Sequence, residues 1–245
     1  MPSPLPLPLR NADVSGLLEF ATQLFRHSLS TCLPLAIAAT LASEAAGLYW
    51  TGTGHKADIS FQRDATFWWL TALGMLVSLW FTGALLLRQR ALCAGKLGTI
   101  RDDLAASGQR WPTVVLATVM AGVLTVIGTL ALVVPGIYVG VCMSPLLAVA
   151  MLERLAPVQS VQRCFTLVRP LWVKVFASWV IAMLIILVIL FAAGLVLALI
   201  VTAMTASERA AAAVNTTAML AMLAAVQVFF CALCFSVYSA ASSSA

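Results

Sequence analysis

The chain has 245 residues, of which 62% are hydrophobic and 9% charged, and its formal net charge is +5. A soluble domain carries about a quarter charged residues, so this composition excludes an ordinary soluble core. The basic residues lie in short segments between apolar runs, where they indicate membrane topology, so we expect no nucleic-acid partner. The apolar runs are far longer than the roughly 10-residue strands of a membrane barrel. We therefore expect an all-α, polytopic membrane helical bundle.

The N-terminal part predicts a tail followed by an amphipathic helix. Residues 1–12 include four prolines, which exclude a helix, so we expect a disordered tail. From Asp13 onward, Leu17, Ala21 and Leu24 share one helical face, while polar side chains occupy the other. This amphipathic helix leads into the first span, and similar segments are expected to lie in the membrane interface before later spans.

The apolar runs predict six transmembrane helices in a single domain, 13–240. From Pro112 onward, 41 residues carry no charge, and one helix of that length would be about 60 Å long, twice the hydrocarbon thickness. The run must therefore turn, and Pro135 with Gly136 predicts the hairpin there. Pro145 is expected to kink the helix that follows. The expected spans are about 28–48, 65–87, 112–134, 136–152, 172–204 and 213–239, and a disordered tail is expected at 241–245.

Lysine and arginine divide unequally between the two sides of this arrangement. With the N-terminus inside, the inner segments carry 11 of them and the outer segments three. This bias predicts that both termini are cytoplasmic, and we expect a bacterial inner membrane. Ten of the inner cations form a predicted basic surface, which sets the topology or binds lipid head groups: Arg26, Arg88, Arg90, Lys96, Arg101, Arg110, Arg154, Arg163, Arg169 and Lys174.

Each inner segment before a hairpin has the same order of features: an amphipathic helix, an arginine, then two spans. This order suggests a threefold repeat of helical hairpins, in which Arg26, Arg110 and Arg169 are equivalent. The alternative is that any short cytoplasmic segment is amphipathic and basic. The repeated units would cover about 14–88, 92–152 and 156–240.

Residues 132–176 carry a family resemblance. A Pro-Gly-Ile hairpin precedes a glutamate, an amphipathic Ser/Cys segment and a tryptophan that opens the next helix. This order resembles the signature of YciC-like bacterial inner-membrane proteins, and it is similar to the membrane domain fused to some glycerophosphodiester phosphodiesterases. The resemblance implies six helices, an inner-membrane location and no established activity; the phosphodiesterase domain has no counterpart here. The matching residues are Pro135, Gly136, Ile137, Glu153, Ser160, Arg163, Cys164 and Trp172.

Residues with catalytic or metal-binding chemistry are few. His27 and His55 fall on opposite sides of the membrane and cannot share a metal. Cys231 and Cys234 have C-x-x-C spacing, but inside an apolar helix they are expected to pack rather than react. We therefore expect no catalytic residue, no metal and no cofactor.

The expected spans also contain residues suited to helix contacts. Gln227, central in the last span, is expected to bond a neighbouring helix, and the alternative is a place in a pore. Small residues allow close helix packing in membranes. The glycines expected to do so are Gly122, Gly128, Gly140 and Gly194.

These features predict a non-enzymatic integral membrane protein, acting as a scaffold or accessory factor in envelope or lipid homeostasis. Its expected partners are membrane lipids, anionic ones among them, and a protein that the sequence does not identify. The alternative is a small permease or lipid carrier that works through the helical bundle.

Overall fold

The structure is a computed structural model that describes residues 13–53, 64–204 and 208–242, with side chains described outside 201–212. The predicted tail at 1–12, His55 and the end of the C-terminal tail lie outside the described residues. All elements within them are helical, as predicted. They are α1 (Val14–Gly52), α2 (Ala65–Cys93), α3 (Ile100–Ala131), α4 (Val133–Cys142), α5 (Leu146–Leu152), α6 (Pro157–Val168), η2 (Arg169–Leu171), α7 (Trp172–Met204) and α8 (Glu208–Ser242).

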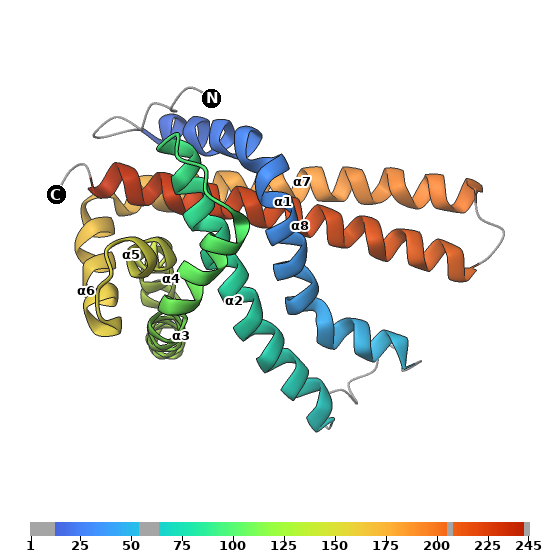
Figure 1. The fold of residues 1–245 in the computed structure, drawn as a ribbon, viewed down its shortest axis with the longest axis horizontal. Coiled ribbons are helices and arrows are strands. Elements are labelled where there is room, and N and C mark those ends of the chain that lie inside the picture. The colour runs from blue at the N-terminus through green and yellow to red at the C-terminus, as the bar shows by residue number, and fades with distance from the viewer. Residues whose placement is uncertain (1–12, 54–63, 205–207, 243–245) are drawn as a thin grey trace.

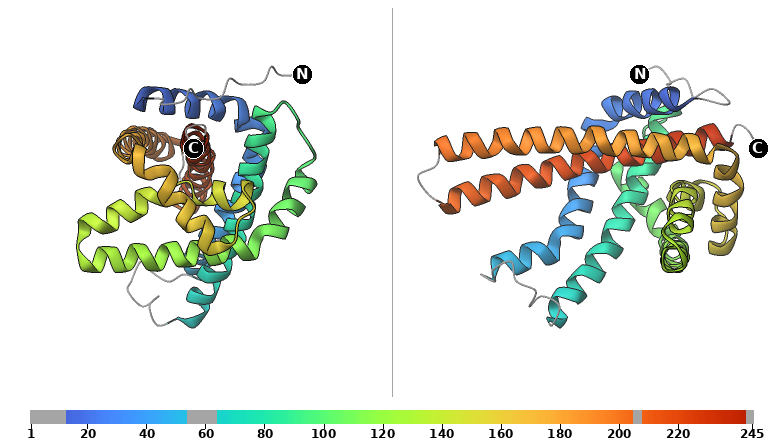
Figure 2. Two further views of the ribbon diagram at one scale, coloured as in Figure 1. Left: turned by 90° about the vertical axis from the view of Figure 1, so that its left-hand side faces the viewer. Right: turned by 180° about the vertical axis from the view of Figure 1, so that it is seen from behind.

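Three helical hairpins diverge from one end of the molecule (Figures 1 and 2). We call them leg 1 (α1 and α2), leg 2 (α3 and α4) and leg 3 (α7 and α8). We call their meeting point the hub: residues 13–31, the end of α2 and the start of α3 with the connection between them, residues 146–174, and the end of α8. Figure 1 shows leg 1 and leg 3 pointing in different directions, and Figure 2 shows leg 2 extending in a third. The ends of the described chain both lie at the hub, and the hairpin turns lie at the far ends.

Six helical stretches within the described residues are long and apolar enough to cross a membrane, which confirms the six predicted spans. The protein is therefore built as a multi-pass membrane protein. The most apolar helix, α7, has 33 residues and is about 50 Å long. That exceeds the roughly 30 Å hydrocarbon core, so α7 must tilt or extend beyond it.

The hairpin of leg 2 turns at Leu132, and the prediction of Pro135 and Gly136 as the turn is wrong by a few residues. Leu132 is extended (φ −167°, ψ 147°) between α3 and α4. Pro135 lies in the first turn of α4. Backbone N–H groups in the first turn have no partner within the helix, so the lack of an N–H in proline costs no hydrogen bond there. Gly136 packs against α3: a Cβ built on Gly128 would lie 3.2 Å from the Cα of Gly136. The Pro-Gly pair thus starts the second helix and lets it approach the first.

The interfacial segments of the first two units are continuous with the spans that follow. The amphipathic segment and the span expected at 112–134 form one helix, because α3 begins at Ile100 and runs through Pro112. Likewise α1 runs through Pro34 and is visibly bent (Figure 1), as expected where a proline removes a helical hydrogen bond. Only the third unit has a separate amphipathic helix, α6, with η2 between it and α7. Where a kink was expected at Pro145, the helix is interrupted: α4 ends at Cys142 and Pro145 is the N-cap of α5.

Most of the glycines at close helix contacts are not the ones predicted from the sequence. Gly74 on α2 lies against the backbone of Ala42 on α1, and Gly83 lies against Met151 and Ser107. A Cβ at either position would clash with these neighbours. Of the four predicted glycines, only Gly128 is in close contact; the other three meet open space: Gly122, Gly140 and Gly194.

We predict that Gly74→Val destabilises the protein by about 2 kcal/mol, because the side chain would press α1 and α2 apart. Gly122→Val is the matched control: it adds the same side chain inside a helix, where a Cβ meets nothing within 4 Å. Thermal unfolding of both variants in the same nanodisc would measure the difference. Equal loss of stability in the two variants would contradict the packing argument.

Candidate functional site

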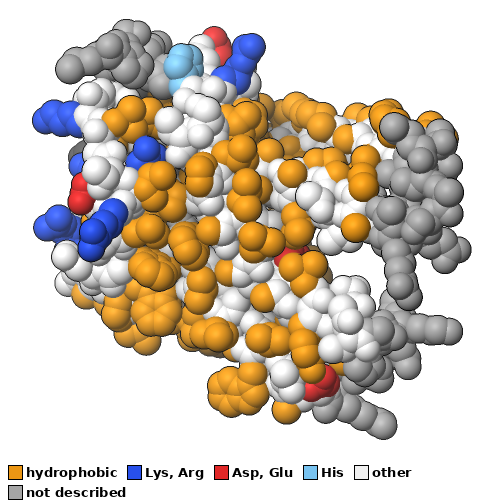
Figure 3. Space-filling view, turned by 45° about the vertical axis from the view of Figure 1, so that its right-hand side comes forward, with side chains coloured by type: hydrophobic (Ala, Val, Ile, Leu, Met, Phe, Trp, Pro, Cys, Tyr) orange, Lys and Arg blue, Asp and Glu red, His pale blue; other side chains and the backbone are white. Residues whose placement is uncertain are grey.

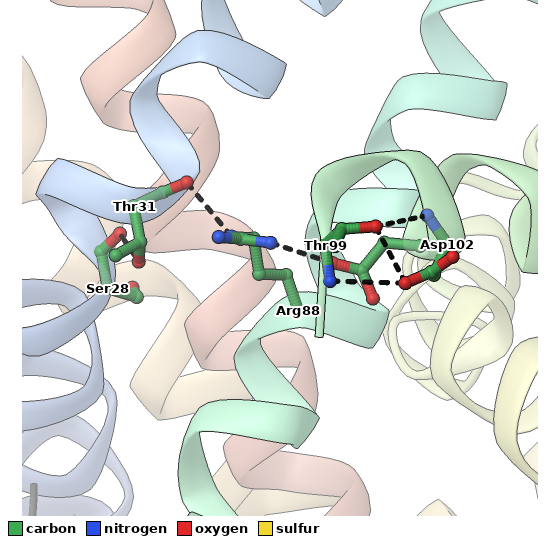
Figure 4. A network of polar contacts seen from close by, with 6 residues as sticks. Ser28, Thr31, Arg88, Thr99 and Asp102 are labelled. Carbon is green, nitrogen blue, oxygen red and sulfur yellow. Dashed lines mark hydrogen bonds and ion pairs between the residues drawn. The ribbon is translucent and has the colours of Figure 1, made fainter. Parts of the chain in front are cut away.

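Arg88 lies inside the hub and not on the predicted basic surface. Its side chain is buried, with 9% of the residue exposed. The guanidinium donates from Nη1 to Oδ2 of Asp103 at 2.9 Å and from Nε to the carbonyl oxygen of Thr31 at 3.1 Å. Figure 4 shows this side chain reaching from α2 to α1 on one side and toward the start of α3 on the other. Arg88 therefore joins three helices, and it is buried where an exposed place on the basic surface was predicted.

The start of α3, which carries Asp103, is fixed by a capping box. The Thr99 hydroxyl donates to Oδ2 of Asp102 at 2.6 Å and accepts from the Asp102 backbone N–H at 3.2 Å (Figure 4). The hydrogen bond from this hydroxyl lowers the pKa of Asp102 below its ordinary value, and the hydrogen bond from the Thr99 backbone lowers it further by a smaller amount. The cap places the first turn of α3 beside Arg88.

Two further ion pairs join the remaining segments of the hub. Arg163 on α6 donates from Nε to Oε2 of Glu153, which follows α5, at 3.1 Å. Lys174 on α7 donates to Oδ1 of Asp13, the N-cap residue of α1, at 3.3 Å. Both cations had been predicted as part of the basic surface, and both are partly neutralised by these contacts.

The three ion pairs follow the order of the three predicted units. The pair between α2 and α3 joins the first predicted unit to the second, and Arg163 joins the third to Glu153, the residue that follows the second. The pair between Lys174 and Asp13 joins the third predicted unit to the residue that precedes the first. These are the ion pairs found among the described residues, and together they form a closed circuit around the hub.

Buried amides add cross-links beside this circuit. Gln89, fully buried on α2, donates to the carbonyl oxygen of Val228 on α8 at 3.0 Å and to the Ser28 hydroxyl on α1 at 3.4 Å. Gln89 was not predicted from the sequence, because it lies between two arginines in a segment interpreted as a loop. These bonds satisfy its Nε2 group and fix the packing of α1, α2 and α8, because a buried donor without a partner is costly.

Gln227 confirms the expected contact with neighbouring helices. Its Oε1 accepts from the Thr40 hydroxyl on α1 at 3.1 Å, and its Nε2 donates to the Thr82 hydroxyl on α2 at 2.7 Å. This contact lies within the apolar stretches of all three helices and ties leg 3 to both helices of leg 1.

Seven of the ten predicted cations remain without an ion pair in the described part of the chain. Arg110 is half-buried and the others are exposed. Counting all described side chains near the hub, ten are basic and five acidic, an excess of five positive charges. Figure 3 shows charged side chains concentrated at this end, while hydrophobic side chains cover much of the legs. The seven cations, which we call the open cations, are Arg26, Arg90, Lys96, Arg101, Arg110, Arg154 and Arg169.

The residues considered for metal or thiol chemistry have structural contacts. His27 lies within hydrogen-bond distance, 3.0 Å, of the Gln23 carbonyl oxygen one turn earlier on α1. Cys231 is buried in a hydrophobic cluster between α1, α2 and α8, and Cys234 is half-buried on the same helix. No group of three or more metal-binding side chains occurs within the described residues.

Comparison with protein-family models, with curated proteins and with solved structures finds no match to this chain.

We predict that Arg88→Met destabilises the protein by about 3 kcal/mol, since it leaves the Asp103 carboxylate without its partner inside the hub. Arg90→Met removes an exposed cation two residues away and should change the stability by no more than about 0.5 kcal/mol. Unfolding in nanodiscs would measure both values.

The double variant Arg88→Met/Asp103→Asn separates the ion pair from general packing. If the ion pair carries the effect, the double variant should lose less stability than the two single variants summed. Additive losses would contradict the assignment.

Proposed function

We propose that the protein is a non-enzymatic scaffold or accessory factor of a bacterial inner membrane, with its hub on the cytoplasmic side. The observation that carries this proposal is the arrangement of charge: three ion pairs hold the splayed hairpins together, and the open cations lie around them. The positive-inside rule supports the cytoplasmic placement of this end. The resemblance of residues 132–176 supports membership of the YciC-like family as part of the same proposal.

Anionic phospholipids are the proposed lipid partners of the hub. Each cation near a membrane surface attracts anionic lipid by about 1 kcal/mol, so seven open cations give a strong collective preference. The paired cations are engaged within the protein and contribute less to this attraction. The proposed surface is thus smaller than the sequence suggested and excludes Arg88.

The polar side chains within the legs bind neighbouring helices, which is also consistent with a scaffold. Both polar atoms of the Gln227 amide are bonded to side chains of leg 1, so this residue acts as a cross-link between helices. The legs expose large apolar surfaces: within the most apolar 18-residue window of the stretch that includes α7, only 6% of the residues are buried inside the protein. Such surfaces are suited to contact with lipid or with the apolar helices of a partner membrane protein.

The test is extraction of the tagged protein into polymer nanodiscs, followed by mass spectrometry of the lipids and proteins that co-purify. We expect enrichment of anionic lipids over the bulk membrane, together with a stoichiometric protein partner. A variant with Arg90, Lys96 and Arg101 changed to Gln should lose most of the lipid enrichment, because each neutralised cation removes about a fivefold preference.

The control variant has the same number of substitutions as the triple Gln variant. It changes three uncharged, exposed residues of leg 2 to Ala: Leu116, Val119 and Val123. This control should retain the enrichment. Turnover of a phospholipid by the purified protein, or solute flux through it in proteoliposomes, would contradict the proposed function and support an enzyme or a permease instead.

A further inference from the structure

An apolar groove runs along leg 3 beneath the first part of α1. It has a volume of about 380 Å³, within the range of small-molecule sites. Its walls come from three helices: Leu18, Thr22 and Phe25 on α1, with the facing sides of α7 and α8. The residues from α7 and α8 are Ala182, Ile185, Ile186, Ile189, Leu190, Met222, Ala225, Val226 and Phe229.

The groove offers no free polar group along its length. Thr22 is the only polar residue in the lining, and its hydroxyl donates to the Leu18 carbonyl oxygen at 2.7 Å. Phe25 and Phe229 meet edge to face, with ring centroids 5.9 Å apart, and form a rigid part of the wall. The chemistry of this lining suits a hydrocarbon chain.

A second hollow continues the groove toward the hub and is bordered by the ammonium group of Lys174. Leu18 lines both hollows, and the second is also bordered by Ser15, Lys174, Asp13 and Ile181, among others. The ion pair between Lys174 and Asp13 is exposed, with 36% and 84% of the two side chains accessible. Exposed ion pairs contribute little to stability, so an anionic ligand can compete with Asp13 for this ammonium group.

The length of the combined groove matches one leaflet of a bilayer. Along α7, Lys174 and Leu190 are 16 residues apart, which corresponds to about 24 Å of helix. Half of a bilayer, with its head-group region, is about 20–22 Å thick. A phospholipid with its phosphate at Lys174 would therefore place the end of an acyl chain near Ile189, Leu190 and Met222.

We propose that this groove is a specific site for one anionic glycerophospholipid, with the phosphate at Lys174 and one acyl chain between α1, α7 and α8. This inference deepens the proposed function, on which it rests, by naming a single lipid site distinct from the open cations of the hub. The head group binds where the ion pair closes the circuit between the third unit and the first.

The test uses photo-crosslinking in phosphatidylcholine nanodiscs. The probe is phosphatidylglycerol with a diazirine near the end of one acyl chain, and a phosphatidylcholine carrying the same group is the zwitterionic comparison. Mass spectrometry of peptides should place the phosphatidylglycerol cross-links at 185–190 of α7 and near Met222 of α8. Lys174→Gln should reduce the preference for phosphatidylglycerol about fivefold, whereas Lys174→Arg, which keeps the positive charge, should retain it.

Filling the groove provides an independent variant. Ile189→Trp places a bulky side chain in the groove and should abolish the cross-links at 185–190 and near Met222. Leu187→Trp is the matched control on the same helix, since Leu187 is 64% exposed and outside the lining. Cross-links that persist in Ile189→Trp, or equal labelling by the two probes, would overturn the proposal.

Comparison with the lipids that co-purify in the polymer nanodiscs distinguishes this inference from the proposed function. If unlabelled anionic lipid is still enriched but the specific cross-links are missing, the groove site is overturned and the proposed function stands. Specific groove cross-links without bulk enrichment would support the site and contradict the role of the open cations.

Discussion

The ion pair between Arg88 and Asp103 is the contact on which the arrangement of the hairpins most depends. Apolar helices in a bilayer gain little hydrophobic free energy from meeting one another, because lipid tails solvate them equally well. The polar contacts between the legs therefore help to fix their directions. Gln227 on α8 binds α1 and α2, Gln89 on α2 binds α1 and α8, and at the hub Arg88 binds α1 and α3.

The other two ion pairs also join a cation to a carboxylate, but they differ from the first in the order of the two charges along the chain or in their exposure. In the first pair the cation belongs to the earlier unit and the anion to the later one, whereas in the pair of Glu153 with Arg163 the order is reversed. The third pair is the most exposed, which makes the junction between α7 and the start of α1 the one most open to ligands. The ion pair of Lys174 with Asp13 thus differs from the other two in its exposure, and the proposed lipid site lies beside it.

The sequence allowed the helices to be predicted but not the role of individual side chains at their ends. Hydropathy located the six spans, because a long uncharged run has few alternatives to a membrane helix. The Leu132 turn was misplaced because Pro135 fits the first turn of a helix as well as it fits a break. Arg88 was misassigned because a count of cations cannot distinguish a side chain in solvent from one that faces a carboxylate 15 residues later. The three units share no obvious ion-pair motif, so their cyclic contacts required the structure.

The central claim is that charged contacts at the hub set the directions of the legs. Double electron–electron resonance between spin labels at Trp69→Cys on leg 1 and Leu130→Cys on leg 2, both highly exposed, would test it most directly. The measurement belongs in nanodiscs, with the six native cysteines replaced. The account predicts one narrow distance distribution that broadens in Arg88→Met and stays narrow in Arg90→Met. An unchanged distribution in Arg88→Met would show that contacts elsewhere hold the hairpins apart.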